Sequence, residues 1–205
     1  MIVTDSNSKQ TAFYSYSGNK LLKMTSEETG DYIIFTYQGD NILKTETYDA
    51  KNKLIESSDN VYTNNKLTQQ KTYWGTVLQA KSDYINNADG SIDITQTSYS
   101  SNGTASIFKD KLYYDSAGNL IKEEQLSSPL TTTTNEYDNK HSPNSNVLGY
   151  TKLPYNSTNN KIKTITKIGD STITETLNYQ YNSQDYPVSS QSTSPYGNTT
   201  ITYLY

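Results

Sequence analysis

The sequence predicts an all-β fold, an antiparallel up-and-down meander of roughly fifteen strands curved into a barrel-like sheet. Two observations carry this prediction. A short unit recurs along the chain, in which a strand ends in Tyr, turns through polar residues and restarts on Leu or Ile. The segments between the turns alternate between two faces or are rich in β-branched and aromatic residues, and no segment shows the periodicity of a helix.

The repeated unit supplies the turns of the predicted meander. Asn, Asp and Gly in these turns tolerate the positive φ angles of tight hairpins, and Asn and Asp side chains also cap their own turns. Eight copies can be aligned, and they span Tyr16–Leu21, Tyr37–Ile42, Tyr48–Leu54, Tyr62–Leu67, Tyr84–Ile92, Tyr114–Leu120, Tyr155–Ile162 and Tyr181–Val188.

Residues 171–181 show the strand pattern most clearly. Thr172, Thr174 and Thr176 would lie on one face of this strand, and Ile173, Glu175 and Leu177 on the other. A period of two is that of a strand with two unlike faces. We therefore expect one polar and one more apolar face along this part of the sheet.

The composition favours a shallow core. Hydrophobic residues make up 32% of the chain, well below the usual ~45–50%. The net charge is only −4 and there are 20 Tyr residues. Each Tyr can bury a ring while its hydroxyl stays at water. We therefore expect a folded but thin structure, rich in Tyr and Thr.

Several function classes are disfavoured by what the sequence lacks. It has 17 Lys and no Arg, and Arg is the residue that reads phosphates and guanine edges, so nucleic-acid binding is not expected. It has no Cys, which excludes disulfides and thiolate chemistry. No apolar run reaches the ~20 residues of a membrane helix. No leader-like segment follows Met1, so an exported protein would have lost its leader.

One domain, residues 1–205, accounts for the whole length. The repeat breaks once, at 138–160, where Pro143 and Pro154 interrupt the strand pattern. Loops of this length are uncommon and are either functional or loosely ordered. We therefore expect a repeat-breaking loop at 138–160, and we look there first for function.

Two stretches resemble known families. Tyr113–Ile121 is similar to the YD repeat of RHS-type proteins, and Glu136–Lys140 followed by Pro143 is similar to bacterial cell-envelope lipoproteins that carry a Tyr-rich, porin-like β-domain of unknown function. Tyr16, Tyr37, Tyr62 and Tyr84 are not followed by Asp, which favours the envelope group. That resemblance implies a porin-like sheet and an exported, lipoprotein-like protein at the periplasm or cell surface. It brings no catalytic residues.

The residues favour no catalytic or metal site. His141 is the only histidine, and with Asp138, Asn144 and Asn146 it matches neither a calcium loop nor a zinc set. We expect it to be a loop histidine at water. No nucleophile elbow is present, and Glu123 and Glu124 would point to opposite faces of a strand. No cofactor is expected.

The best aromatic candidates for ligand contact are Tyr73 and Trp74, because exposed rings stack on the apolar faces of sugars. The alternative, which we favour, is that Trp74 packs in the core and Tyr73 covers a neighbouring strand. With the residues of the loop, the candidate ligand-binding set is Tyr73, Trp74, Asp138, His141, Tyr150 and Tyr155.

A membrane-spanning barrel is not expected, although the chain ends on an alternating aromatic segment, residues 201–205. Such a barrel needs an outward apolar band on every strand. Lys161, Lys163 and Lys167 share one face of their strand, and each Lys in mid-membrane costs roughly 2–4 kcal/mol.

Two functions remain open. The first is a non-enzymatic binding or structural module of the envelope, with a glycan or envelope protein as partner, anchored to lipid through a segment outside this sequence. The alternative is a hydrolase acting on a surface polysaccharide or peptide. An enzyme is the less favoured of the two, because no catalytic constellation is evident.

Overall fold

A computed structural model describes residues 2–5, 9–195 and 197–205, with only the backbone of 2–5 and 9. The described chain consists of strands and turns. None of its segments forms a helix of the length and hydrophobicity that a membrane crossing requires. The strands are β1 (Ile2–Asp5), β2 (Lys9–Ser17), β3 (Lys20–Ser26), β4 (Tyr32–Gln38), β5 (Asn41–Tyr48), β6 (Leu54–Thr63), β7 (Lys66–Trp74), β8 (Val77–Asn86), β9 (Ile92–Tyr99), β10 (Ala105–Tyr114), β11 (Leu120–Gln125), β12 (Thr131–His141), β13 (Asn159–Ile168), β14 (Ser171–Tyr181), β15 (Pro187–Ser194) and β16 (Gly197–Thr202).

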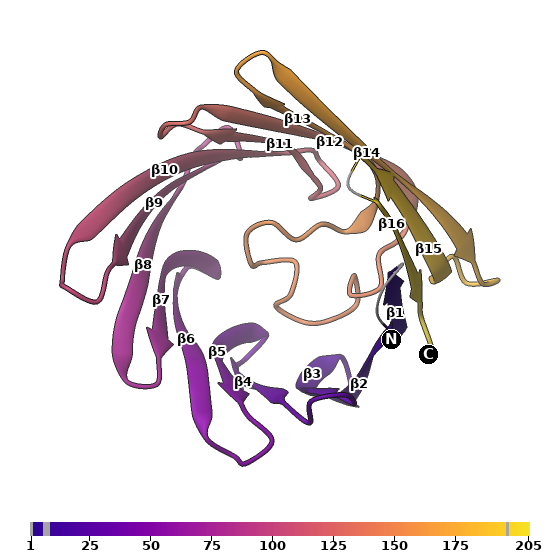
Figure 1. The fold of residues 1–205 in the computed structure, drawn as a ribbon, viewed down its shortest axis with the longest axis horizontal. Helices are drawn as coiled ribbons and strands as arrows, with labels where there is room; N and C mark the ends of the chain where they lie inside the picture. Colours follow the sequence, from indigo (N-terminus) through magenta and orange to yellow (C-terminus); the bar gives the residue numbers. More distant parts are fainter. Residues whose placement is uncertain (1, 6–8, 196) are drawn as a thin grey trace.

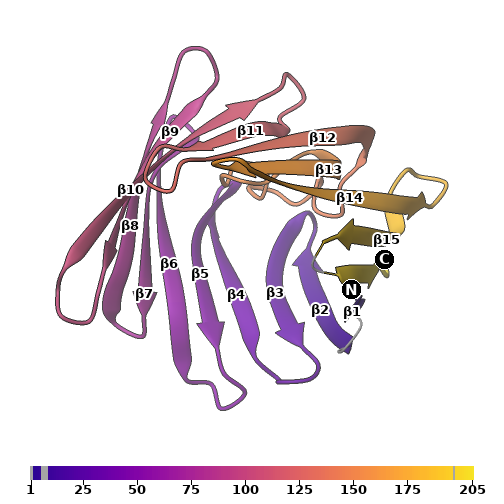
Figure 2. The same ribbon diagram turned by 45° about the horizontal axis from the view of Figure 1, so that its top comes forward.

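These strands form one antiparallel meander, in which each strand pairs with the next along the chain. β1 pairs with β16 on one side and with β2 on the other, so the pairing continues around a barrel. Figure 1 looks into this ring, and Figure 2 shows the strands side by side around the wall. The predicted all-β meander of roughly fifteen strands is confirmed. The sequence did not distinguish an open sheet from a closed barrel.

A β-bulge lies at the Tyr of eight hairpins. The register skips one residue of the partner strand there, directly after the residue that pairs with the Tyr. The pairs are Tyr16 with Leu21, Tyr37 with Ile42, Tyr48 with Leu54, Tyr62 with Leu67, Tyr73 with Leu78, Tyr114 with Leu120, Tyr137 with Lys161 and Tyr181 with Pro187. Bulges bend a strand and increase its twist. The repeated unit is therefore a curvature device as well as a turn signal.

The Leu and Ile residues of the repeat form the core on the inner face. Leu67, Tyr84, Ile94, Leu112 and Leu120 make one buried cluster. Ile42 is fully buried, and its carbonyl oxygen accepts bonds from Asn60 Nδ2 at 2.9 Å and Tyr62 Oη at 3.0 Å.

The same clamp recurs across the barrel. Asn135 Nδ2 and Tyr137 Oη donate to the Leu120 carbonyl at 2.9 and 2.8 Å. An Asn-x-Tyr sequence thus ties one hairpin to the preceding one in two places. Buried carbonyl groups need such partners.

The outer face carries the charges. Along a strand, successive side chains point to opposite faces, so Lys111 points outward where Leu112 points inward. Ion pairs link residues two apart on the same strand, with Nζ to carboxylate distances of 2.9 Å for Lys44–Glu46, 2.8 Å for Lys81–Asp83 and 2.7 Å for Lys122–Glu124. The wall therefore separates an exterior with ion pairs from an interior in which Leu, Ile, Tyr and Asn predominate.

The segment that breaks the repeat lies inside the barrel (Figure 1). β12 continues to His141 and β13 begins at Asn159, so the predicted loop 138–160 is corrected to residues 142–158, here called the plug. Asp138–His141 is strand because its backbone continues alongside β13 after a bulge. The predicted copy Tyr155–Ile162 is not a hairpin but the end of the plug, and Tyr137 takes the place of the repeat Tyr.

The plug is docked against the wall by close contacts. Leu153 packs against the core cluster, and Leu148 N donates to Asn19 O at 2.9 Å. Gly149 has φ +76, and a Cβ there would lie 2.7 Å from Asp40 O and 3.0 Å from Ile42 N. Only a glycine fits where the plug backbone comes this close to the wall, so the plug packs against the wall in one defined position.

Gly149→Ala should destabilise the protein by about 1–3 kcal/mol more than Gly103→Ala, because it adds a backbone clash to the conformational cost. Gly103 has a similar φ of +81 with open space around its Cβ position, so it is a matched control. Urea unfolding of both variants gives the difference. Equal losses would show that Gly149 is not pressed against the wall.

Candidate functional site

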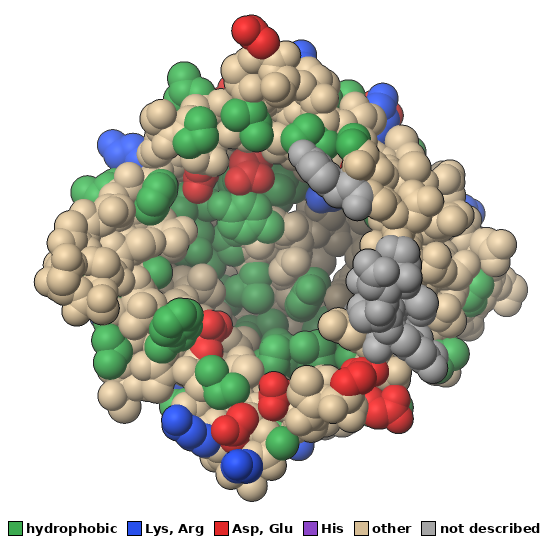
Figure 3. All heavy atoms as spheres, viewed as in Figure 1, with side chains coloured by type: hydrophobic (Ala, Val, Ile, Leu, Met, Phe, Trp, Pro, Cys, Tyr) green, Lys and Arg blue, Asp and Glu red, His purple; other side chains and the backbone are tan. Residues whose placement is uncertain are grey.

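A cavity with a volume of about 650 Å³ lies between the plug, β2, the β14–β15 turn and the C-terminal residues. We call it the plug cavity. The space-filling view in Figure 3 shows the barrel interior as a hollow with hydrophobic side chains in its depth. The aromatic lining residues are Phe13, Tyr14, Tyr16, Tyr186, Tyr203 and Tyr205, and the amide residues are Asn19, Asn146, Asn182 and Gln184.

No described lining residue of the plug cavity is charged. Aromatic faces and side-chain amides offer apolar contact together with hydrogen-bond donors and acceptors. Burial raises the pKa of Tyr14 to about 12, with smaller contributions from Tyr150 and other nearby tyrosines, and burial raises the pKa of Tyr203. The hydroxyls therefore stay neutral at ordinary pH, so the described lining offers apolar contact and hydrogen bonding.

Several cavity rings are fixed by their own hydroxyls. Tyr205 Oη donates to Pro187 O at 3.0 Å, Tyr203 Oη lies 3.2 Å from Ser190 Oγ, and Tyr186 Oη accepts a bond from Asn146 Nδ2. Tyr186 and Tyr205 also meet edge to face, with centroids 5.6 Å apart. The rings are held in place before any ligand arrives, which lowers the entropic cost of binding.

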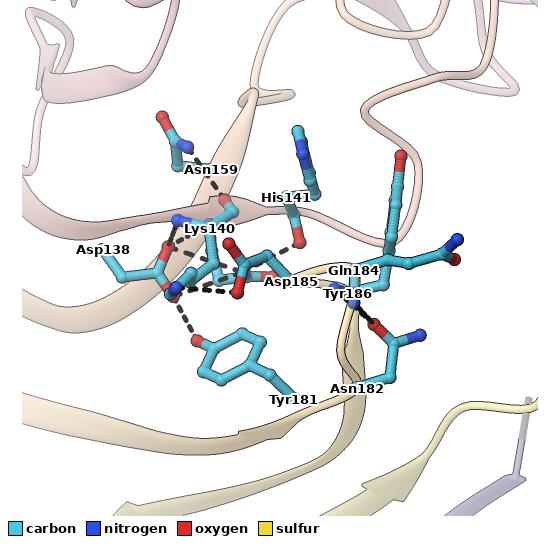
Figure 4. A network of polar contacts seen from close by, with 10 residues as sticks. Asp138, Lys140, His141, Asn159, Tyr181, Asn182, Gln184, Asp185 and Tyr186 are labelled. Carbon is cyan, nitrogen blue, oxygen red and sulfur yellow. Dashed lines mark hydrogen bonds and ion pairs between the residues drawn. The ribbon is translucent and has the colours of Figure 1, made fainter.

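The root of the plug is held by a polar network around Asp138 (Figure 4). Its Oδ1 accepts from Lys140 N at 3.0 Å and Asn160 N at 3.1 Å, and Tyr181 Oη donates to Oδ2. Burial, and then this bond to Asp138, raise the pKa of Tyr181. Asp138 thus ties β12, β13 and β14 together where the plug begins.

His141 lies at the mouth of the plug cavity. Its ring is exposed and stacks on Tyr186, with centroids 4.8 Å apart and planes at 22°. Its backbone N donates to Asp185 O at 3.2 Å, next to the 2.7 Å ion pair between Lys140 and Asp185. Within the described chain no hydrogen bond to its imidazole is seen. The histidine is exposed as expected, but it ends a strand and extends a line of rings.

The two loop tyrosines lie inside the barrel. Tyr150 is close enough for its charge to affect the pKa of Tyr14 and Tyr16. Tyr155 has φ +69, rare for a bulky residue, and burial raises its pKa, followed by the charges of Asp110 and Glu123. Asp138 and His141 therefore lie where the plug begins, and Tyr150 and Tyr155 are part of the plug itself.

Tyr73 and Trp74 lie apart from this group, at the opposite rim. Trp74 pairs with Val77 across the β7–β8 turn and is 64% exposed, so the expectation of a core Trp74 is wrong. Tyr73 is partly buried and follows the bulge. A tryptophan that flanks a two-residue turn at the rim has no second layer to cover it, because the wall is a single sheet.

Charged side chains also lie inside the barrel, and their placement there was not predicted from the sequence. Burial, and then the charge of Asp110, raise the pKa of Glu123, and burial raises that of Asp110. Lys161 lies near Glu123 and Glu175, and burial lowers its pKa. The prediction that Lys161 shares a face with Lys163 is therefore wrong, because the register with β12 shifts between these two residues. The alternation of side chains along a strand could have predicted the inward position of Asp110, because it places Asp110 on the same face as Leu112. In the described residues no group of three or more His, Cys, Asp or Glu could hold a metal ion.

Comparison with known proteins supports the fold. Two solved structures described as porin-like proteins are similar over nearly the whole chain. The one from Bacteroides vulgatus has a TM-score of 0.67 and 16% identity, and covers 99% of this chain and 97% of its own. The one from Bacteroides uniformis has a TM-score of 0.64 and 13% identity, with 99% and 93% covered. At this identity the likeness shows the fold alone.

The other comparisons found nothing. No protein-family model matches the sequence, and no curated protein matches it. The porin-like fold expected from the envelope resemblance is thus present. The lipoprotein character and the YD repeat are not tested by these likenesses.

Glu123→Gln and Glu124→Gln should change stability in opposite directions. The pKa of Glu123 is raised from 4.5, so its ionisation disfavours the folded state at neutral pH, and this cost disappears as pH falls to 4.5. Bonds from Lys122 and Tyr113 lower the pKa of Glu124, so its stabilisation exists above 4.5 and is lost as pH falls through the lowered pKa.

At about pH 7, Glu123→Gln should therefore raise the Tm by about 1–2 °C, discounted for partial exposure, and Glu124→Gln should lower it. Both differences should shrink towards about pH 4. Thermal unfolding across this range measures them. A loss of stability in Glu123→Gln at neutral pH would contradict the inward placement of Glu123.

Proposed function

We propose that the protein is a non-enzymatic binding module that receives a glycan in the plug cavity. The observation that carries the proposal is the lining, which combines six aromatic rings with four amide side chains and, among the described residues, no charge. Sugars present apolar ring faces and many hydroxyls, so aromatic faces and amides are the groups that match them.

The fixed rings strengthen this proposal. Tyr186, Tyr203 and Tyr205 line the cavity, and the partners of their hydroxyls restrict the motion of their rings. A platform already in its bound geometry binds more tightly than a flexible one. Backbone and side-chain bonds at the root of the plug hold the opposite wall in place.

We propose further that the module is exported, acts in the periplasm or at the cell surface, and is attached to lipid by a segment outside the sequence. The porin-like likenesses and the envelope resemblance support export. The charged outer face supports a wall that does not face lipid, because a buried outward Lys is costly there. An envelope protein remains the second kind of partner. Fractionation of cells expressing the full gene tests the compartment.

A hydrolase of surface polysaccharides or peptides is the alternative, and one observation favours it. Asp110 and Glu123 share the interior, and both have raised pKa values, as a general acid requires. A hydrolase that used His141 as a general base is less favoured, because this ring is exposed and stacks on Tyr186. Release of reducing ends from a bound glycan, lost in Glu123→Gln, would favour the hydrolase.

Tyr186→Ala should weaken binding of a glycan identified on an array by about ten-fold, which equals about 1.4 kcal/mol. The substitution removes the ring that faces both His141 and Tyr205. Tyr186→Phe keeps the ring and should retain most of the affinity. Isothermal titration calorimetry measures the dissociation constants.

Trp74→Ala is the matched control, because it removes an equally large ring at the opposite rim. It should leave the affinity unchanged. The reverse pattern, with loss in Trp74→Ala and none in Tyr186→Ala, would place the binding surface at Tyr73 and Trp74 and contradict the cavity assignment.

A further inference from the structure

The plug cavity extends along β2. Its lining follows this strand and the turn after it from Thr11 to Gly18, seven residue steps that span roughly 20 Å at the rise of a strand. A cavity lined over this length can hold a chain that lies along the strand.

One end of the plug cavity is built from groups suited to a chain that continues outward. The β14–β15 turn places Asn182 and Gln184 at this end, beside Tyr186. His141 stacks on Tyr186 outside the cavity lining. The aromatic surface therefore extends beyond the cavity itself, as a ligand longer than the cavity would need.

The charges of the interior lie elsewhere. Asp110, Glu123 and Lys161 belong to β10, β11 and β13, and none of them lines the plug cavity. An ionised ligand group among these described lining residues would lose its hydration and find no counter-charge. The lining therefore discriminates against acidic and basic chains.

We infer that the ligand is a linear and uncharged oligosaccharide, which lies lengthwise along β2 and leaves the cavity past His141. This inference rests on the proposed glycan-binding function and adds the shape and charge of the ligand. Several sugar units bind at once, so affinity grows with chain length.

The test is a length series measured by calorimetry on the whole protein, with neutral β-linked glucose oligomers from glucose to the hexamer. Affinity should rise by several-fold per added unit and then level off when the cavity is filled. Equal affinity for glucose and the hexamer would overturn the inference and leave the proposed function standing. No binding of any sugar on a broad glycan array would overturn the proposed function itself.

Charge is tested with galacturonate oligomers of the same lengths, which should bind at least ten-fold more weakly than their neutral counterparts. Equal or tighter binding would overturn the neutral assignment. A neutral Gly/Ser decapeptide that bound more tightly than every sugar would assign the cavity to an extended peptide and overturn the glycan class.

Asn182→Asp places a charge at the mouth without removing the turn. Asn182 Oδ1 accepts from Gln184 N at 2.9 Å and Tyr186 N at 3.0 Å, and an Asp keeps both bonds. Asn102→Asp is the control, because Asn102 Oδ1 accepts from Thr104 N at 3.0 Å in another turn. Asn182→Asp should weaken the galacturonate oligomers several-fold more than the neutral hexamer, and Asn102→Asp should change neither. Identical behaviour of the two variants would show that the chain does not pass this mouth.

Discussion

The bulged pairing between a strand-ending Tyr and a residue just past the turn is the constraint on which the structure depends. It recurs at eight hairpins, for example between Tyr62 and Leu67 and between Tyr114 and Leu120. Each bulge adds bend and twist to a sheet whose strands are otherwise regular. It also places the Leu or Ile directly after the turn, where Leu67 and Leu120 join the buried cluster. One local feature thus supplies both the curvature of the wall and the residues of its core.

The curved wall encloses more space than so few aliphatic residues can fill, and the plug occupies part of it. Leu153 completes the core cluster, while Gly149 allows the plug backbone to touch the wall between Asp40 and Ile42. Part of the remaining space is the plug cavity, whose lining is rich in Tyr and Asn. A low aliphatic content therefore has a structural consequence here, because the interior is left partly hollow and polar enough to hold a ligand.

The fold was predictable from the sequence because its signals are local. Turn residues, the alternation of 171–181 and the Tyr-to-Leu spacing each act within a few residues, and the burial of β14 alternates as expected. The location of the plug was not predictable, because it depends on contacts distant in sequence, such as Lys152 Nζ with Asn41 Oδ1 at 2.8 Å. Trp74 was wrongly predicted to be buried. Tryptophan is commonly buried where a second layer covers a sheet, and the wall of this barrel is only one sheet thick. The inward placement of Asp110 was predictable, because side chains alternate along a strand and Asp110 lies two residues before Leu112.

The distribution of charge inside the barrel argues for binding over chemistry at the plug cavity. Catalysis of hydrolysis needs groups that exchange protons near neutral pH, and the described lining of the cavity holds amides, apolar groups and tyrosines. Burial raises the pKa of Tyr14, Tyr16, Tyr203 and Tyr205, so these hydroxyls become less able to ionise. The same burial that prevents proton transfer keeps each hydroxyl a neutral donor and acceptor over a wide pH range. These properties fit the binding role that we propose, in which the ligand keeps its covalent bonds.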